Sequence, residues 1–244
     1  MNCEEINPYD DRREKGKQVK DMFDSIAPAY DFMNRAMTLG IDRRWRSIAI
    51  GMVAEGNHDD ILDIATGTAD LAILMAHRLD PVTVTGIDLS EQMLAKGRRK
   101  VEDEDLSDTV KLVQGDCLQL PFPDESFDLV TCAFGVRNFE NLLAGYREMY
   151  RVLRKGGRVC ILELSTPTSG LVRPFYNLYT RHIIPTLGRA VSSDTRAYSY
   201  LPESIAAVPQ GAEMTGLMER AGFKDCTFRR LTFGVCTIYT GEKI

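Results

Sequence analysis

The sequence has few of the residues that hold metal ions. It contains only three histidines, His58, His77 and His182, and none lies at a recognisable spacing from a second metal ligand. The six cysteines are scattered along the chain, without the C-x-x-C spacing of many zinc and redox sites. We therefore expect no metal centre, and we expect the cysteines to be buried, reduced thiols of a reducing compartment.

Long apolar runs and basic stripes are also lacking. No segment approaches the roughly twenty apolar residues of a membrane-spanning helix, and the acidic first residues have no apolar signal-peptide core. The net charge of −5 argues against nucleic acid as the main partner. We predict a cytoplasmic protein, or one that is peripheral to a membrane.

Residues 1–57 form a predicted helical N-terminal extension. Helical patterning covers about residues 15–55 and is interrupted where Pro28 disfavours helix at Ala27. This extension also holds the one basic segment, with Lys15, Lys17, Lys20, Arg43, Arg44 and Arg46. These side chains fit either a solvated helix face or a surface that meets a membrane.

The rest of the chain alternates between strand and helix patterns. Strands are expected at about 61–64, 84–88, 110–114, 127–134 and 158–164, and the last follows a helix that Lys155, Gly156 and Gly157 end. Two more strand-like runs near the C-terminus predict an antiparallel hairpin at the sheet edge. The prediction is a single α/β domain with a doubly wound, mostly parallel, seven-stranded sheet. Residues 166–205, rich in proline and aromatics, break this rhythm and predict an inserted substrate lid.

The first strand-to-helix turn points to a nucleoside ligand. Asp88 ends the second strand about twenty residues after the turn, where a carboxylate can bind a ribose diol. The turn keeps only Gly67, with Ala65 and Ala69 beside it, whereas a dinucleotide site needs three glycines to close on a pyrophosphate. Asp63 at the first strand end would repel a phosphate but tolerate a cationic sulfonium. The turn thus favours S-adenosylmethionine over NAD, and it makes Asp63, Gly67 and Asp88 candidate cofactor-binding residues.

Several longer motifs resemble those of one enzyme family. They are FDSIAPAYD at 23–31, AFGVRN at 133–138, YRVLRKGGR at 150–158, LSTP at 164–167 and YSYLPESI at 198–205. With the acidic turn, they resemble class I S-adenosylmethionine-dependent methyltransferases. More narrowly, they resemble the ubiquinone/menaquinone biosynthesis C-methyltransferase family, and the resemblance covers nearly the whole chain.

The resemblance implies further cofactor contacts by Thr68, Asp116 and Cys117. Thr68 offers a hydroxyl and an amide near the methionine part, Asp116 can accept the adenine amine, and Cys117 would contribute its backbone amide. Two alternatives stay open at this point. Thr68 can instead be a helix N-cap, and Asp116 can instead be a carboxylate that caps its own turn.

The resemblance also implies a polyprenyl demethylmenaquinol acceptor and places Arg137 and Asn138 in the catalytic role. Arg137 would orient a water or stabilise the phenolate, because a guanidinium cannot accept a proton, and Asn138 would hold a ring hydroxyl. The alternative is an ion pair from Arg137 to a helix acid, with Asn138 as an N-cap. Other side chains expected to line the acceptor pocket are Tyr30, Asp31, Tyr176, His182, Asp194 and Tyr200.

The acceptor and partners are less narrowly defined. A related polyprenyl benzoquinol, as in ubiquinone biosynthesis, and O- or N-methylation of a small molecule are the alternative reactions, and a binding protein without turnover is the alternative outside the enzymes. A polyprenyl tail partitions into lipid, so we expect transient contact with a membrane surface. An exposed C-terminal edge strand can pair two subunits into a homodimer.

Overall fold

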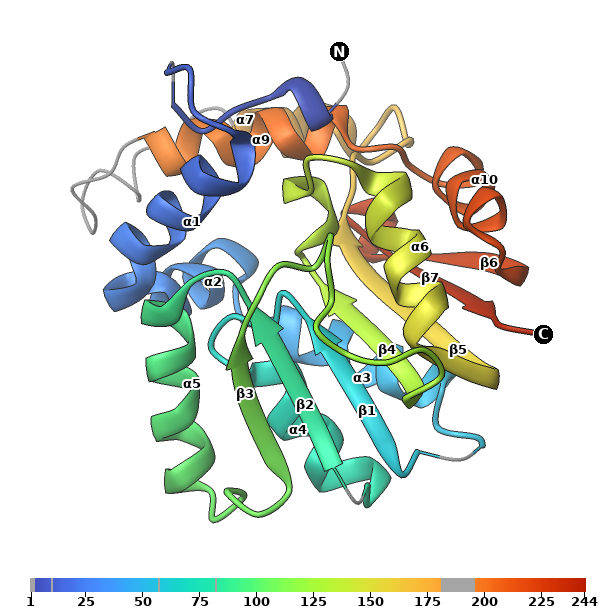
Figure 1. Cartoon of the computed structure of the whole chain (residues 1–244). Coiled ribbons are helices and arrows are strands. Elements are labelled where there is room, and N and C mark those ends of the chain that lie inside the picture. Colours follow the sequence, from blue (N-terminus) through green and yellow to red (C-terminus); the bar gives the residue numbers. More distant parts are fainter. Residues whose placement is uncertain (1–2, 10, 57, 82, 181–195) are drawn as a thin grey trace.

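The computed structural model describes residues 3–9, 11–56, 58–81, 83–180 and 196–244 of the 244-residue chain. A seven-stranded sheet forms its centre (Figure 1), with the strand order β3-β2-β1-β4-β5-β7-β6. The strands are β1 Asp60–Ile64, β2 Thr83–Asp88, β3 Val110–Gln114, β4 Phe127–Ala133, β5 Leu153–Leu164, β6 Lys224–Leu231 and β7 Cys236–Glu242. β1 to β5 pair in parallel, and β7 runs antiparallel between β5 and β6. The predicted fold class and the C-terminal hairpin at the edge are confirmed.

Helices cover both faces of this sheet. The helices are α1 Lys15–Ile26, α2 Tyr30–Thr38, α3 Asp42–Met52, α4 Asp70–Leu79, α5 Glu91–Asp103, α6 Leu142–Val152, α7 Arg173–Leu178, α9 Arg196–Ala207 and α10 Ala212–Ala221. One core packs α6 and α10 against the sheet, and the other packs α3 and α4 against its opposite face. Because both faces are covered, β1 and β4 are buried along almost their whole length and are mostly apolar.

A smaller third core lies above the carboxyl ends of the strands. Met22 and Ile26 of α1, Met33 of α2, and Ala197 and Tyr200 of α9 pack together there. α1, α2 and α9 therefore gather at the same end of the sheet, although α9 is far from the other two in sequence (Figure 1). In an open parallel sheet this is the end where ligands bind.

One bound of the predicted strands is wrong. β5 begins at Leu153 and not at Arg158, because α6 ends at Val152 and Gly156, at φ +79°, lets the chain bend within the strand. Residues 196–207 form one helix, α9, despite Pro202.

The basic N-terminal residues do not form one solvated face. Lys15 is buried, with its Nζ 2.5 Å from the carbonyl oxygen of Cys3, and Arg46 is buried in an ion pair with Asp42. Lys17, Lys20, Arg43 and Arg44 remain more accessible to solvent.

The cysteines are free thiols, and four of the six, Cys3, Cys132, Cys160 and Cys236, are buried. Cys117 and Cys226 are half-buried. Among the described residues, no cluster of three histidine, cysteine or acidic side chains is placed to hold a metal ion. No helix in the described part of the chain has the length and apolar character needed to cross a membrane.

Candidate functional site

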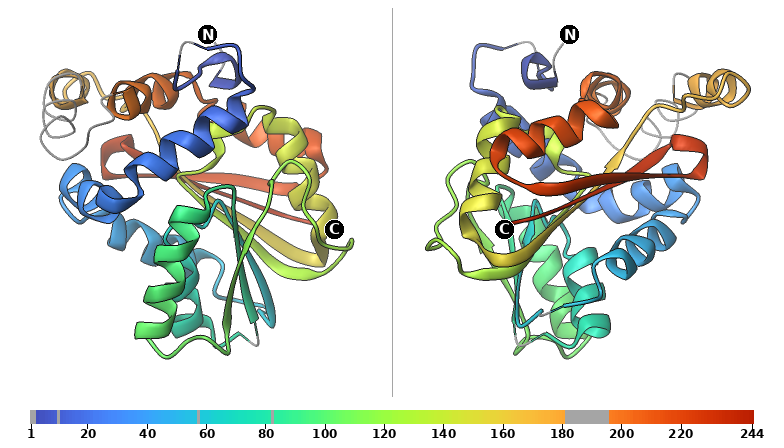
Figure 2. Two further views of the ribbon diagram at one scale, coloured as in Figure 1. Left: turned by 60° about the vertical axis from the view of Figure 1, so that its left-hand side comes forward. Right: turned by 90° about the vertical axis from the view of Figure 1, so that its right-hand side faces the viewer.

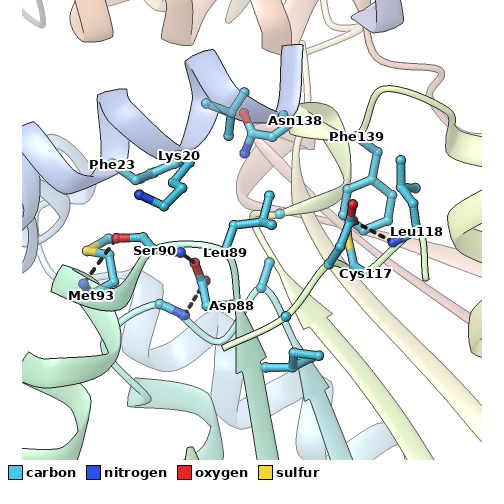
Figure 3. Close-up of a pocket in the computed structure, with 18 of the residues that line it drawn as sticks. Lys20, Phe23, Asp88, Leu89, Ser90, Met93, Cys117, Leu118, Asn138 and Phe139 are labelled. Carbon is cyan, nitrogen blue, oxygen red and sulfur yellow. Dashed lines mark hydrogen bonds between the residues drawn. The ribbon is translucent and has the colours of Figure 1, made fainter. Parts of the chain in front are cut away.

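A cavity lies at the carboxyl ends of β1, β2, β3 and β4, beneath α1 (Figure 3). Its floor is made by the turns that follow the four strands, including Gly67, Asp88, Asp116 and Asn138. Lys20 and Phe23 of α1 face these turns from above, as Figure 3 shows. Apolar side chains, among them Leu89, Leu118 and Phe139, form much of the wall. The cavity thus combines a few acidic groups with flat apolar surfaces.

Asp88 is the best-positioned acid of this cavity. Its Oδ2 accepts the Gly67 amide at 2.8 Å and its Oδ1 accepts the Ser90 amide at 2.9 Å. The Ser90 hydroxyl in turn accepts the Met93 amide and caps α5. Burial raises the pKa of Asp88 to about 6, although the two amide hydrogen bonds oppose that shift. The carboxylate is therefore held in a fixed orientation and is charged at neutral pH.

Three residues of the turn after β1 adopt the left-handed conformation that favours glycine, although only one of them is a glycine. Ala65, Gly67 and Ala69 all have positive φ, at 53°, 57° and 65°. Each left-handed alanine costs roughly 1 kcal/mol relative to its usual conformation. The turn therefore follows the path that glycines would favour, and the neighbouring Gly135 makes room for it, because a Cβ on Gly135 would lie 2.6 Å from the Ala65 Cβ.

Substituting Gly135 with alanine is expected to destabilise the fold by roughly 1–3 kcal/mol, the usual cost of overpacking. The new methyl group would also meet the Cys132 sulfur at 2.7 Å. The double variant Ala65→Gly/Gly135→Ala removes one of these clashes and should recover part of the loss in urea unfolding. Gly51→Ala on α3 is the control, because nothing lies within 4 Å of its added Cβ. Equal stability of Gly135→Ala and Gly51→Ala would contradict the close packing at this turn.

Two of the predicted cofactor residues do not line the cavity. The Thr68 hydroxyl donates to Asp31 at 2.6 Å and accepts from Lys100 at 2.9 Å, so it ties α2 and α5 to the turn. It does not cap α4 either, since Ala69 occupies the N-cap position. Asp63 is fully buried, and its two oxygens accept the hydroxyls of Thr66 and Thr131, both at 2.7 Å. Asp63 thus orders the end of β1 from behind the cavity.

Asp63→Asn is expected to raise the free energy of unfolding at neutral pH. Burial raises the pKa of Asp63 to about 6, above its ordinary value of 3.8, so the charged form is disfavoured in the folded protein. Asparagine keeps the shape without the charge. The free energy of unfolding of Asp63→Asn should exceed that of the wild type by an amount that grows between about pH 4 and pH 6. Above pH 6 this difference should stay constant, at up to about 3 kcal/mol. Urea unfolding across this pH range measures it, with surface Asp80→Asn as the control; a less stable variant at pH 8 would contradict the expectation.

Asp116 lines the cavity from an exposed position after β3. Its Oδ1 accepts the Leu118 amide at 2.8 Å, which is the turn-capping arrangement foreseen as the alternative. That bond leaves the residue at the cavity wall beside Cys117, which also lines it. Turn capping and a cofactor contact are therefore compatible here.

A second, larger cavity of about 400 Å³ adjoins the first. It lies between α2, α3, α7, α9 and the turn between β6 and β7, and its wall is mostly apolar and aromatic, with Asn34, Asp42 and Arg137 among its polar residues. Phe134 lines both cavities. Arg137 lines the second cavity and Asn138 the first, and both residues border a small third cavity with Tyr30 and Tyr200. Arg137 and Asn138 thus stand where the cavities meet.

Arg137 is buried and paired with an acid on the sheet. Its Nη1 lies 2.9 Å from Oε1 of Glu163 on β5 and also donates to the Phe134 carbonyl oxygen. Its Nε is buried and has no hydrogen-bond partner among the described residues. Burial disfavours the charge, but the carboxylate of Glu163 outweighs it, so the pKa of Arg137 is raised. The alternative of an ion pair is therefore seen, with a strand acid in place of a helix acid.

Asn138 is not a helix N-cap. Its Oδ1 accepts the hydroxyl of Tyr200 at 3.1 Å, which links the turn after β4 to α9. The N-cap of the next helix is Asn141.

Comparisons with known proteins assign the chain to one family. The model of the ubiE/COQ5 methyltransferase family matches residues 11–243. The chain belongs to the ubiE/COQ5 methyltransferase family. Demethylmenaquinone methyltransferase of Bacteroides fragilis is 49% identical over 240 residues, which are 98% of each chain. The enzyme of that name from Porphyromonas gingivalis is 48% identical over 241 residues, again 98% of each chain.

Solved structures support the fold of this family member. Phosphoethanolamine N-methyltransferase 2 of Haemonchus contortus, solved with S-adenosyl-L-methionine, aligns with a TM-score of 0.61 at 16% identity, over 80% of this chain and 51% of that one. The cyclase SpnF aligns with a TM-score of 0.69 at 15% identity, over 93% and 96%. At this identity the likeness shows the fold alone.

The structure of this ubiE/COQ5 family member also holds a site residue that the sequence predictions missed. Glu163 is fully buried beside Arg137, and its signal was a lone acid within the apolar run of β5. Of the expected acceptor-pocket residues, Tyr30, Tyr176 and Tyr200 line cavities, whereas Asp31 is bound to Thr68 and Lys100. His182 and Asp194 lie outside the described residues.

Proposed function

We propose that this protein methylates a ring carbon of a polyprenyl demethylmenaquinol, with S-adenosylmethionine as the methyl donor, to give menaquinol. The observation that carries the proposal is the near-half identity, along 98% of the chain, to demethylmenaquinone methyltransferases. The geometry supports it, because a cavity with a fixed carboxylate meets an apolar cavity at Arg137 and Asn138.

The first cavity fits a cationic nucleoside. Asp88 would accept the ribose hydroxyls, since its orientation is held by two backbone amides and its oxygens keep lone pairs for further donors. Asp116 and the amide of Cys117 would bind the adenine edge, and apolar side chains such as Leu89 and Phe139 would pack on its faces. The acids at the strand ends suit a positive ligand and oppose a pyrophosphate. When bound, S-adenosylmethionine supplies an activated methyl group.

The second cavity fits the acceptor, because its apolar and aromatic wall suits a naphthoquinol ring. Loss of a phenolic proton makes the adjacent ring carbon nucleophilic; the methyl–sulfur bond then breaks, a carbon–carbon bond forms, and the ring carbon loses its proton. Arg137 would stabilise the phenolate through its unpartnered Nε, since Glu163 already balances its charge. Asn138, oriented by Tyr200, would donate its amide to a ring hydroxyl.

A related polyprenyl benzoquinol is the second candidate acceptor. A relative from Geobacter sulfurreducens, 44% identical over 231 residues, is named ubiquinone/menaquinone biosynthesis C-methyltransferase. The same cavities would serve either quinol, because both rings carry a hydroxyl next to the methylated carbon. Methylation of a small polar molecule is less favoured by the apolar wall of the second cavity.

The test is methyl incorporation from labelled S-adenosylmethionine into a short-tailed demethylmenaquinol under reducing conditions. Mass spectrometry locates the new methyl, and a benzoquinol with the same tail is assayed in parallel. We expect ring-carbon methylation of the naphthoquinol. Cofactor binding without product from either quinol would overturn the proposed acceptor class and retain only the cofactor site.

A further inference from the structure

Large apolar side chains are exposed around the mouth of the second cavity. Phe175 on α7 and Phe233 in the β6–β7 turn line that cavity and are 75% and 77% exposed. Leu171, Leu178 and Leu39 each directly precede or follow a residue of the cavity wall and are 84%, 58% and 86% exposed. These five side chains, here called the apolar rim, come from three segments that are far apart in sequence.

The three segments lie along one side of the molecule. The right-hand view of Figure 2 shows α7, the β6–β7 turn and the α2–α3 turn one above another at the same side. Within α7, Phe175 and Tyr176 border the cavity, whereas Leu178 is exposed and is not part of the cavity wall. Yet no residue of α7 is buried. Apolar side chains that are exposed together in this way normally mark a surface that binds another protein or a membrane.

The charge of these three segments indicates which kind of partner binds the apolar rim. Residues 34–48, 166–180 and 229–235 hold seven arginines and one acid, Asp42, in a chain with a net charge of −5. Asp42 is already paired with Arg46. All six other arginines are exposed, but Arg35 and Arg43 border another cavity, whose wall includes Asp70, Asp103 and Glu104. The remaining four, in no ion pair among the described residues, are Arg44, Arg173, Arg229 and Arg230. Arginines around exposed apolar groups match a surface with anionic head groups over hydrocarbon.

We propose that the apolar rim docks on an anionic lipid bilayer, so that the second cavity opens directly into the membrane. This inference rests on the proposed function, in which the acceptor carries a polyprenyl tail. Leu171, Leu178 and Leu39 enter the acyl boundary, and the arginines bind lipid phosphates. The quinol head group then reaches Arg137 through the cavity while its tail stays in the bilayer.

The test compares the wild type with Leu171→Asp/Leu178→Asp in flotation with phosphatidylglycerol and phosphatidylcholine vesicles. We expect the wild type to bind phosphatidylglycerol vesicles, more weakly at high salt, and the double variant to bind at least about tenfold less. Ile244→Asp is the matched control, since Ile244 is 72% exposed at the C-terminus, away from the rim (Figure 2). It should bind as the wild type does.

Activity separates this inference from the proposed function. All three proteins should methylate a short-tailed quinol in solution equally, whereas Leu171→Asp/Leu178→Asp should lose about tenfold in rate on a long-tailed quinol in vesicles. If the wild type methylates the short-tailed quinol but does not bind phosphatidylglycerol vesicles, the membrane-docking inference is overturned and the proposed function stands. Vesicle binding without methylation overturns the function and keeps the surface. A third outcome is that the wild type is a dimer, the double variant is a monomer, and neither binds vesicles. The rim would then be an interface between two copies of the chain, and the inference would be overturned.

Discussion

Arg137→Ala is expected to lower kcat/KM for quinol methylation by about 10²–10³-fold, the usual effect of removing one donor that stabilises developing charge. The same substitution should also lower the free energy of unfolding by about 3–5 kcal/mol, because it leaves the Glu163 carboxylate buried without its partner. A rate measured on this variant alone would therefore mix chemistry with damage to the fold.

The double variant Arg137→Gln/Glu163→Gln separates the two effects. Two neutral amides can keep a hydrogen bond in place of the ion pair. Glu163 accepts the backbone amides of positions 137 and 164 through separate oxygens, and the amide at position 163 keeps an oxygen for only one of them. Because one buried backbone amide then lacks its acceptor, we expect the double variant to recover part of the stability that Arg137→Ala loses and to stay about 1–3 kcal/mol below the wild type in urea, while methyl transfer stays low. Wild-type turnover by a stable double variant would show that Arg137 has only a structural role.

Much of the sheet is predictable because its strands are read from continuous apolar runs. β1 and β4 are buried on both faces, so apolar residues such as Ile61, Leu62, Leu129 and Val130 prevail in them, and each run stands out between turns. The place of β7 is not predictable in the same way. A hairpin pattern near the C-terminus indicates antiparallel pairing, but it does not tell which of the two strands joins β5.

The cofactor side of the site was more predictable than its acceptor side. Asp88 ends β2 and Asp116 lies two residues after the end of β3, so strand prediction places both at one edge of the sheet. The second cavity is assembled from α2, α7, α9 and the β6–β7 turn, and no local pattern reports contacts between segments so far apart. Thr68 illustrates the remaining limit, because whether a hydroxyl faces a ligand or Lys100 depends on how α5 packs beside the turn.

Asp88→Ala is expected to weaken S-adenosylmethionine binding by about 100-fold. Each hydrogen bond to a charged group contributes roughly 1.5–3 kcal/mol, and the variant would lose the ribose contacts together with the acceptor that holds the Gly67 and Ser90 amides. Calorimetric titration measures the affinity. Asp116→Asn is the matched comparison, since asparagine can still accept the Leu118 amide, and we expect it to lose less than about tenfold.

The pH dependence of binding tests the same carboxylate without truncating it. Because the pKa of Asp88 is raised to about 6, the free protein carries the charged acceptor above pH 6 and progressively protonates below it. A protonated carboxyl keeps one acceptor oxygen but presents a donor to the ribose hydroxyls, so affinity should fall as the pH drops from 7 to 5. Asp88→Asn should bind weakly and with little change over that range. If wild type and Asp88→Asn showed parallel pH profiles, the ribose contact would have to be reassigned to another residue of the cavity.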